Sequence, residues 1–511
     1  IMTSGAAKDL KEGTSRTQSS VTLGRFAEHQ VAASVATKFE GNALSLSLGK
    51  NESRGYNALN PSSYSNGYGG FYAANPGPNG YANEFYSMAW SRQISNETEL
   101  GFKASHSRLN SQFDNIYADS PNDIWENKTA VNLYSLYIKQ NVNQDWQTRL
   151  QYSDSQNDQA TYTNGAFNQS YGSFSTRYKN WNWENTYALT DRQLMTFGLT
   201  SSHIQLNASH LGYTVDYSTN PATYSSIPVS IAPNLNTSRL YAGLASQWDR
   251  WNTQLTLSQD QLGQGISTGN FLAGLGYSLG GGYKATATRS SAMLAPTVGQ
   301  KYDPSYGGNP SLSPERSFSD EVGIQFRAEN LNWRLVAFKV QYQRMISFGT
   351  HLVSDPFWAS QYVYQLENLG QSRNKGYEWS SNWRQGPLNL GLNLTVQSPE
   401  NLDTQIKPIN KAGRFGSLRA GYELTGQTKL NWMTYMTSDR YTLSPSPNDT
   451  AASPSRASGY AVHNLALTHQ WDANWSAKFS LMNVFDKHYS PIVGYVPQPR
   501  TWLFTLSHQS F

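Results

Sequence analysis

Residues 474–489 of the chain read NWSAKFSLMNVFDKHY, and the last twelve residues, 500–511, read RTWLFTLSHQSF. In the first stretch the apolar residues at 475, 477, 479 and 481 alternate with mostly polar ones. This period-two pattern predicts a β-strand with two different faces. The second stretch returns as another strand and ends on Phe511. Because a chain that ends inside a strand leaves a sheet edge exposed unless the sheet closes, the C-terminus predicts a closed sheet.

The composition indicates which closed sheet to expect. Charged residues make up 14% of the 511 residues and aromatic residues 13%, and the mean hydropathy is −0.59. A soluble chain of this length should divide into domains of about 100–200 residues, and no such division is visible. The aromatic content is too high for a disordered chain. No apolar run reaches about 18 residues, so the sequence excludes an ordinary transmembrane helix, but it does not exclude a membrane.

A transmembrane strand needs only about 9–11 residues with alternating lipid-facing and lumen-facing side chains, so a membrane barrel is hydrophilic on average. Strand-like segments here are joined alternately by short turns and long polar loops. Short turns are predicted at 40–42, 95–97, 143–145, 190–192, 249–250, 280–282, 385–386, 425–426 and 472–474. Long loops are predicted at 56–82, 111–128, 155–168, 207–236, 293–317, 347–372, 399–412 and 440–459.

This asymmetry between two ends is typical of outer-membrane barrels, which have short periplasmic turns and longer extracellular loops. With Gln169–Leu189 taken as one long strand, the sequence predicts an all-β transmembrane antiparallel β-barrel of about 22 strands. The chain is expected to lie in the outer membrane of a Gram-negative bacterium, with outer-membrane lipid as a partner. Tryptophans recur beside the short turns, where an amphipathic ring suits the membrane interface: Trp146, Trp248, Trp251, Trp333, Trp383, Trp471 and Trp475.

The sequence carries little that indicates catalysis or nucleic-acid binding. The net charge of +4 is nearly balanced and the basic residues form no runs, so no nucleic-acid partner is expected. The nine histidines are scattered, and there is neither a Gly-x-Ser-x-Gly elbow nor a phosphate loop. We therefore predict that the protein is not an enzyme. An outer-membrane hydrolase stays an alternative only if distant Ser, His and acid residues meet in space.

Two long loops hold candidate binding residues. The first is rich in Tyr, Gly and Asn, a composition that suits adaptable recognition; its candidates for ligand binding are Tyr64, Tyr68, Phe71 and Tyr72. A surface loop with no binding role is the alternative. The second set consists of carboxylates, the ligands that a hard cation such as calcium prefers: Asp114, Asp119 and Asp123, with Asp154 and Asp158 in the next segment. Solvated loop carboxylates are the alternative there.

Three motifs carry a family resemblance. They are LAPTVGQKY (294–302) followed by GNPSLSPERS (308–317), then ENLGQSRNKGYE (367–378), and finally NVFDKHY (483–489). In spacing, in order and in position relative to the C-terminus they resemble segments of TonB-dependent outer-membrane transporters. The resemblance covers the whole chain and implies a 22-stranded barrel that imports a scarce nutrient. It also adds Tyr302 and Tyr306 to the ligand-binding candidates.

Within that family the chain looks most like the cobalamin transporter group. The segment 293–317 lacks the histidine that haem receptors of the family place there, which argues against haem. The loop QFDNIY (112–117) resembles the calcium loop of the cobalamin group, and this resemblance carries Asp114 over as a calcium ligand. The expected cargo is therefore cobalamin or another metal chelate such as a siderophore. No cofactor is expected apart from calcium.

The resemblance also implies a plug domain with an energy-coupling box before the barrel, and no such segment is found in this chain. Residues 1–16 look like the remnant of a plug-to-barrel connection, and residues 17–511 are expected to form the barrel. The expected partners are thus a plug domain, in cis or as a separate chain, and TonB acting through it. A passive plugless pore, or a surface receptor used by phage or bacteriocins, is the alternative function.

Overall fold

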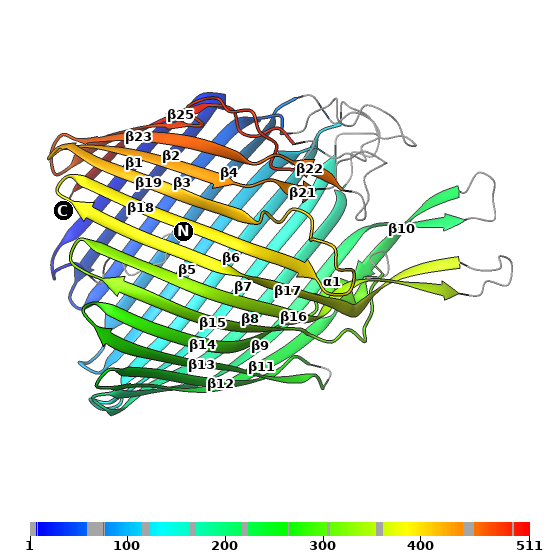
Figure 1. Ribbon diagram of the computed structural model, residues 1–511, viewed down its shortest axis with the longest axis horizontal. Helices are drawn as coiled ribbons and strands as arrows, with labels where there is room; N and C mark the ends of the chain where they lie inside the picture. Colours follow the sequence, from blue (N-terminus) through cyan, green and yellow to red (C-terminus); the bar gives the residue numbers. More distant parts are fainter. Residues whose placement is uncertain are drawn as a thin grey trace.

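The computed structural model is a closed antiparallel β-barrel of 22 strands, which confirms the predicted fold class (Figure 1). The structure describes residues 7, 9–58, 75, 77–114, 123–163, 170–216, 223–263, 265–303, 307–353, 361–442, 454–492 and 495–510. The strands of the first half are β1 (Ser15–Gly24), β2 (Glu28–Phe39), β3 (Asn42–Tyr56), β4 (Asn79–Gln93), β5 (Thr98–Phe113), β6 (Trp125–Asn141), β7 (Trp146–Thr163), β8 (Ser170–Thr190), β9 (Gln193–Asp216), β10 (Thr223–Ile231), β11 (Asn234–Trp248), β12 (Trp251–Gln261), β13 (Ser267–Gly280) and β14 (Tyr283–Leu294).

The remaining strands complete the wall. They are β15 (Glu315–Arg327), β16 (Leu331–Val353), β17 (Gln361–Gln385), β18 (Leu388–Asn401), β19 (Arg414–Thr425), β20 (Thr428–Thr437), β23 (Tyr460–Gln470), β24 (Trp475–Met482) and β25 (Thr501–Ser510). A separate two-stranded ribbon, β21 (Arg440–Thr442) with β22 (Ser455–Ala457), lies outside the barrel sheet. The described helical segments are η1 (Arg25–Ala27) and α1 (Val298–Tyr302). None of the helices among the described residues is long and apolar enough to cross a membrane.

The sheet contains one strand more than the barrel has positions, because β10 pairs only with β9. β9 is long enough to pair with β11 over its first half and with β10 over its second half. A break at residues 232–233 separates β10 from β11, so the two together fill one position in the wall. The β9–β10 hairpin therefore extends the wall beyond the barrel (Figure 1).

The barrel closes where the first strand meets the last. β1 and β25 are antiparallel, with Thr17 opposite Ser510 and Gly24 opposite Leu503. The hydroxyls of Thr17 and Ser510 lie 2.6 Å apart and hydrogen-bond across this seam. The prediction that the C-terminal strand belongs to a closed sheet is thus confirmed, and its partner is β1.

Large apolar side chains lie on the outside of the barrel, where they are exposed. Across the seam Val21 and Leu23 are each 46% exposed, and their register partners are Leu506 and Phe504. Lipid takes the place of a protein core for this surface. Side chains of the opposite parity face the lumen, so the strict alternation seen in the sequence separates a lipid face from an aqueous face.

The two ends of the barrel differ as predicted. Short turns join the strands at one end, on the left in Figure 1, and the long connections lie at the other end. Tryptophans mark the short-turn end: Trp248 and Trp251 are register partners, and Trp251 lies 4.5 Å from Tyr277 between ring centroids. Trp471 and Trp475 are 50% and 42% exposed. Their exposure beside the turns fits rings that lie at a membrane interface.

Several segments that were predicted as loops are strands, and those predictions were wrong. β7 continues to Thr163, β9 continues to Asp216 and β16 continues to Val353. Beyond the lipid both faces of a strand contact water, so the apolar alternation disappears although the ladder of backbone hydrogen bonds continues.

The Asn-Val-Phe-Asp-Lys motif turns the chain out of β24. Asn483 has a left-handed backbone with φ of 49°, a conformation that asparagine tolerates better than most residues. Its side chain accepts a hydrogen bond of 2.8 Å from the Lys487 N–H and donates bonds of 3.1 Å to the carbonyls of Lys487 and Gln498. Asp486 accepts a 2.7 Å bond from the Arg500 N–H, which holds the pKa of that carboxyl below its usual range. The motif therefore binds the loop onto the start of the last strand.

Candidate functional site

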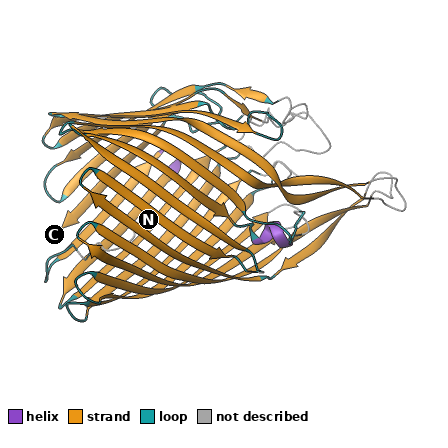
Figure 2. Ribbon diagram, turned by 60° about the horizontal axis from the view of Figure 1, so that its bottom comes forward, coloured by secondary structure: helices purple, strands orange, loops and turns teal. Residues whose placement is uncertain are grey.

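A segment that we call the strap, residues 295–314, joins β14 to β15 at the long-loop end; residues 304–306 within it lie outside the described part. It contains α1, which lies at the mouth of the barrel (Figure 2). A capping box fixes the start of α1: the Gln300 N–H donates to the Thr297 hydroxyl at 3.1 Å, and the Thr297 N–H donates to Gln300 Oε1 at 2.8 Å. These two bonds hold the first turn of α1 in place at the beginning of the strap.

One end of the strap is bound to β17. Asn368 Oδ1 accepts from the Ser313 N–H, and Asn368 Nδ2 donates to the Ser313 carbonyl, each at 2.8 Å. Asn309 Nδ2 donates to the Leu366 carbonyl, also at 2.8 Å. Leu312, between these contacts, is only 1% exposed. Two of the three motifs that carried the family resemblance are thus in direct contact.

The other end of the strap reaches β9. His210 Nε2 lies 3.2 Å from Asp303 Oδ2, and the side chains are 14% and 7% exposed. Phe174 of β8 stacks on the His210 ring at 6.0 Å between centroids. Lys301 is also buried here, and its burial lowers the pKa of its ammonium group. Because both side chains are largely buried, removal of either one leaves the other without this polar contact.

The strap therefore spans part of the mouth. β9 is separated from β14 by four inter-strand steps, through β11, β12 and β13, which corresponds to roughly 19 Å at 4.8 Å per step. Gly308 permits the tight path between the two anchors, because a Cβ at this position would lie 2.7 Å from the carbonyl oxygen of Asp303. The described part of the strap is thus anchored to β9 at one end and to β17 at the other.

Only one of the predicted ligand-binding residues falls within the described part of the chain. Tyr302 is the last residue of α1 and lies half-buried at the mouth. The other candidates lie outside the described residues: Tyr64, Tyr68, Phe71, Tyr72 and Tyr306. Their role in ligand binding stays a prediction.

Asp114 follows the last residue of β5 at the long-loop end. Asn79 Nδ2 donates to Asp114 Oδ2 at 2.7 Å, while Oδ1 is buried with no hydrogen-bond partner among the described residues. Burial raises the pKa of the Asp114 carboxyl above its usual value. Asp123, before β6, accepts a 3.4 Å bond from Asn75 through its backbone carbonyl, and Asp119 lies outside the described residues.

Asp158 does not lie near Asp114 and Asp123. Phe113, Trp125 and Thr163 are register partners along one row, and Asp158 lies five residues further down β7, roughly 16 Å along the strand. It accepts bonds from Gln156 instead, at 3.0 and 3.1 Å. Across the described ranges no three His, Cys, Asp or Glu side chains gather as metal ligands. The calcium prediction thus narrows to the segment from Asp114 to Asp123.

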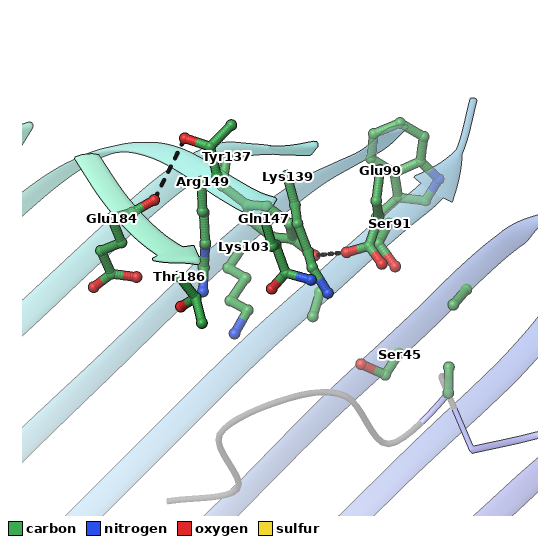
Figure 3. A pocket seen from close by; sticks show the side chains of 15 residues that line it. Ser45, Ser91, Glu99, Lys103, Tyr137, Lys139, Gln147, Arg149, Glu184 and Thr186 are labelled. Atoms are coloured by element: carbon green, nitrogen blue, oxygen red, sulfur yellow. Dashed lines mark hydrogen bonds between the residues drawn. The ribbon is translucent and has the colours of Figure 1, made fainter. Parts of the chain in front are cut away.

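A charged recess, which none of the predictions from the sequence included, lies on the inner wall. It has a volume of about 330 Å³. Tyr137 donates a 2.6 Å bond to Glu99, and the Arg149 guanidinium lies 4.4 Å from the Tyr137 ring (Figure 3). Charged side chains from β5, β6, β7 and β8 line this inner-wall recess: Glu99, Lys103, Lys139, Arg149 and Glu184.

The chain reaches its first strand from the same side. Ala7 is 3% exposed and packs against Ala36 and Ala43. Ala43 lines the inner-wall recess together with Ala7, so the segment that precedes β1 lies against the luminal face. A signal for the recess was present in the sequence, because its charged residues have the parity opposite to the apolar ones on each strand. The contact between His210 and Asp303 had no such signal.

Comparison with known proteins agrees with this architecture. Residues 32–484 match the family model for the TonB dependent receptor-like β-barrel. A structure of a mutant ferric enterobactin receptor, PfeA, from Pseudomonas aeruginosa is similar with a TM-score of 0.79 at 17% identity, covering 98% of this chain and 81% of that one. The copper transporter OprC gives 0.75 at 12% identity, covering 97% and 80%. The siderophore receptor PiuA from Acinetobacter baumannii gives 0.73 at 11% identity, covering 97% and 82%.

The family match spans most of the chain and includes the first two sequence motifs and the first two residues of the third, Asn483 and Val484. The similar structures, at such low identity, support the fold. The family consists of transporters and not of enzymes. The chain is therefore a β-barrel of the TonB-dependent receptor family, and it belongs in the outer membrane of a Gram-negative bacterium.

Proposed function

We propose that this chain is the barrel of an active importer for a scarce, bulky metal chelate. The observation that carries the proposal is the inner wall: a closed barrel of 22 strands whose lumen side bears a charged recess, with the chain entering β1 along that wall. A barrel of this width leaves a lumen that its own side chains do not fill. Passage of a large solute through a gated lumen suits this arrangement.

The first candidate for the cargo is a ferric siderophore. PfeA is described in complex with enterobactin, and PiuA is described as a siderophore receptor. The cobalamin assignment suggested by the sequence resemblance is not supported by these comparisons, which supply siderophore and copper proteins. Cobalamin therefore becomes the second member of the cargo class, to be tested beside the siderophore.

The proposed mechanism needs binding and movement but no covalent chemistry. The extracellular loops capture the chelate, with Tyr302 at the mouth and the aromatic residues of the 56–82 loop as binding candidates. A plug domain, in cis or as a separate chain, closes the lumen and moves when TonB pulls on it. We propose that residues 1–16 connect that plug to the barrel. Ala7, which packs on the inner wall, supports this route.

Two measurements on the full chain in outer-membrane vesicles test the proposal. Ferric enterobactin and cyanocobalamin serve as probes, each titrated while bound ligand is measured by filtration. The proposal expects saturable binding of one probe at one site per barrel, and TonB-dependent uptake in cells that also carry the plug. Uptake that stays linear with concentration and shows a size cutoff, without saturable binding, would instead establish a passive pore.

A further inference from the structure

A row of charged side chains crosses the outer face of β14 to β17. Arg289 is opposite Asp320, Asp320 is opposite Lys339, and Lys339 is opposite Lys375. These residues share the parity of the exposed apolar residues Val322 and Tyr377, so they point away from the lumen. The last pair places two like charges directly opposite each other on adjacent strands, an arrangement that destabilises a sheet unless an anion offsets it.

Two other outward-facing lysines lie opposite carboxylates. Lys50 is opposite Glu84, and Lys179 is opposite Asp154. Asp320 lies opposite Lys339, but the ion pair it forms, of 3.5 Å, is with Arg289 on its other side. By contrast, neither Lys339 nor Lys375 has a carboxylate within 4.0 Å among the described residues, and both side chains are exposed. The row thus holds three cations and one carboxylate, and the positive charge that is left over lies at the two lysines.

The height of the two lysines along the barrel axis decides which layer of the membrane they contact. Lys339 lies eight residues above the start of β16, and Lys375 lies ten residues above the end of β17 at its short turn. With a rise of about 3.3 Å per residue and a tilt of about 40°, both lie roughly 20–25 Å above the short-turn end. The apolar band of such barrels is about 25 Å tall. The two lysines thus lie at the interface of the outer leaflet.

The wall below the lysines is apolar. Val322 and Tyr377 are 65% and 60% exposed, and Leu335 is 37% exposed. Ala337 is opposite both Val322 and Tyr377 in the adjacent row. Exposed apolar side chains directly below a pair of ammonium groups match an amphiphile whose anionic head lies above its acyl chains.

We propose that Lys339 and Lys375 form a binding site for a phosphate group of lipopolysaccharide in the outer leaflet. The two ammonium groups hold the phosphate between them, and the acyl chains lie along Val322, Leu335 and Tyr377. Charge complementarity and continuity with the lipid-facing wall identify a lipid, because a soluble anion has no use for the apolar surface below. Arg373, two residues above Lys375, is engaged by Glu400 at 2.7 Å and stays outside the site.

The test measures binding of lipid A to the full-length chain in detergent, by native mass spectrometry over a range of lipid concentrations. The variant K339Q/K375Q removes both charges, and the matched control K50Q/K179Q removes two outward charges that face carboxylates. We expect K339Q/K375Q to bind lipid A roughly thirtyfold more weakly than the wild type. The control and the charge-preserving K339R/K375R should bind as the wild type does.

Two further arms fix the source of the phosphate. Dephosphorylated lipid A should bind the wild type as weakly as lipid A binds K339Q/K375Q, and millimolar inorganic phosphate should not displace lipid A. Equal binding by K339Q/K375Q and the wild type would overturn the proposal. So would equal loss in K50Q/K179Q, or full displacement by inorganic phosphate. Heat-dependent gel mobility confirms that each variant is a folded barrel.

Discussion

Asn368 forms two hydrogen bonds of 2.8 Å with the backbone of Ser313, although the two residues lie 55 positions apart in the chain. A third bond, of 2.9 Å, runs from Asn368 Nδ2 to the Arg344 carbonyl. One side chain thus joins the strap to β17 and to β16.

Asn368→Ala should therefore loosen the β17 end of the strap. The loss of partners for the Ser313 backbone groups costs about 1–3 kcal/mol locally. Hydrogen exchange measured by mass spectrometry should accelerate at residues 307–314, while the strands β5 to β8 keep their protection. Asn368→Asp keeps the acceptor but loses both donated bonds, so its exchange rate should lie between those of Asn368→Ala and the wild type. Unchanged exchange in Asn368→Ala would contradict this role.

His210→Gln should release the other end. The polar contact with Asp303 is lost, and exchange at α1 should accelerate roughly fivefold, as expected for a loss of about 1 kcal/mol. Residues 309–314 should stay protected because Asn368 still holds them. If both ends loosen together in either variant, the strap is a single cooperative unit and not a segment with two independent anchors.

The raised pKa of Asp114 predicts in which direction the stability of the barrel changes with pH. Burial raises its pKa in the folded protein, so the folded state binds more protons than the unfolded state between the usual aspartate range near pH 4 and the raised value. The stability of the β4–β5 end should thus increase as the pH falls through this window. Hydrogen exchange of residues 79–82 should slow accordingly. Asp114→Asn should abolish the pH dependence while it keeps an acceptor for Asn79.

The same variant tests the calcium prediction. If the segment from Asp114 to Asp123 binds calcium, millimolar Ca²⁺ at neutral pH should protect residues 79–82 from exchange in the wild type, since the cation offsets the buried charge. Asp114→Asn should show no such protection. Asp158→Asn should respond to calcium as the wild type does, because Asp158 lies far down β7. Lack of calcium protection in the wild type would leave these residues as loop carboxylates.

Asn483→Ala should destabilise the end of β24. The side chain is 4% exposed and loses three hydrogen bonds, at a cost of about 1–3 kcal/mol. Alanine adds the strain of the left-handed backbone, about 1 kcal/mol. Asn483→Gly removes the bonds without that strain, so it should be the less harmful change. Denaturant unfolding of the barrel in detergent measures both, and equal stability of the two variants would exclude the strain.

The sequence predicts the closed barrel, its strand number and its short turns because these follow from period-two alternation and local turn residues. The strands that contain Val21 and Phe504 can be predicted because lipid lies on one side of the wall and water on the other. Above the lipid this contrast ends, and β9 and β16 continue through segments that read as loops. The pair His210 and Asp303 depends on a strap that crosses the mouth, and no local pattern encodes such a contact.

Under the proposed function, the uneven strand lengths also bear on how cargo first meets the protein. β9 has 24 residues and β17 has 25, whereas β1 and β25 at the seam have 10 each. The β9–β10 and β16–β17 hairpins lie on the wall opposite the β1–β25 seam and project beyond the rim of the barrel (Figure 1). Under the same proposal, cargo that approaches the mouth from this side meets the hairpins before it reaches the lumen. Shortening either hairpin should slow capture while leaving the residence time of bound cargo unchanged.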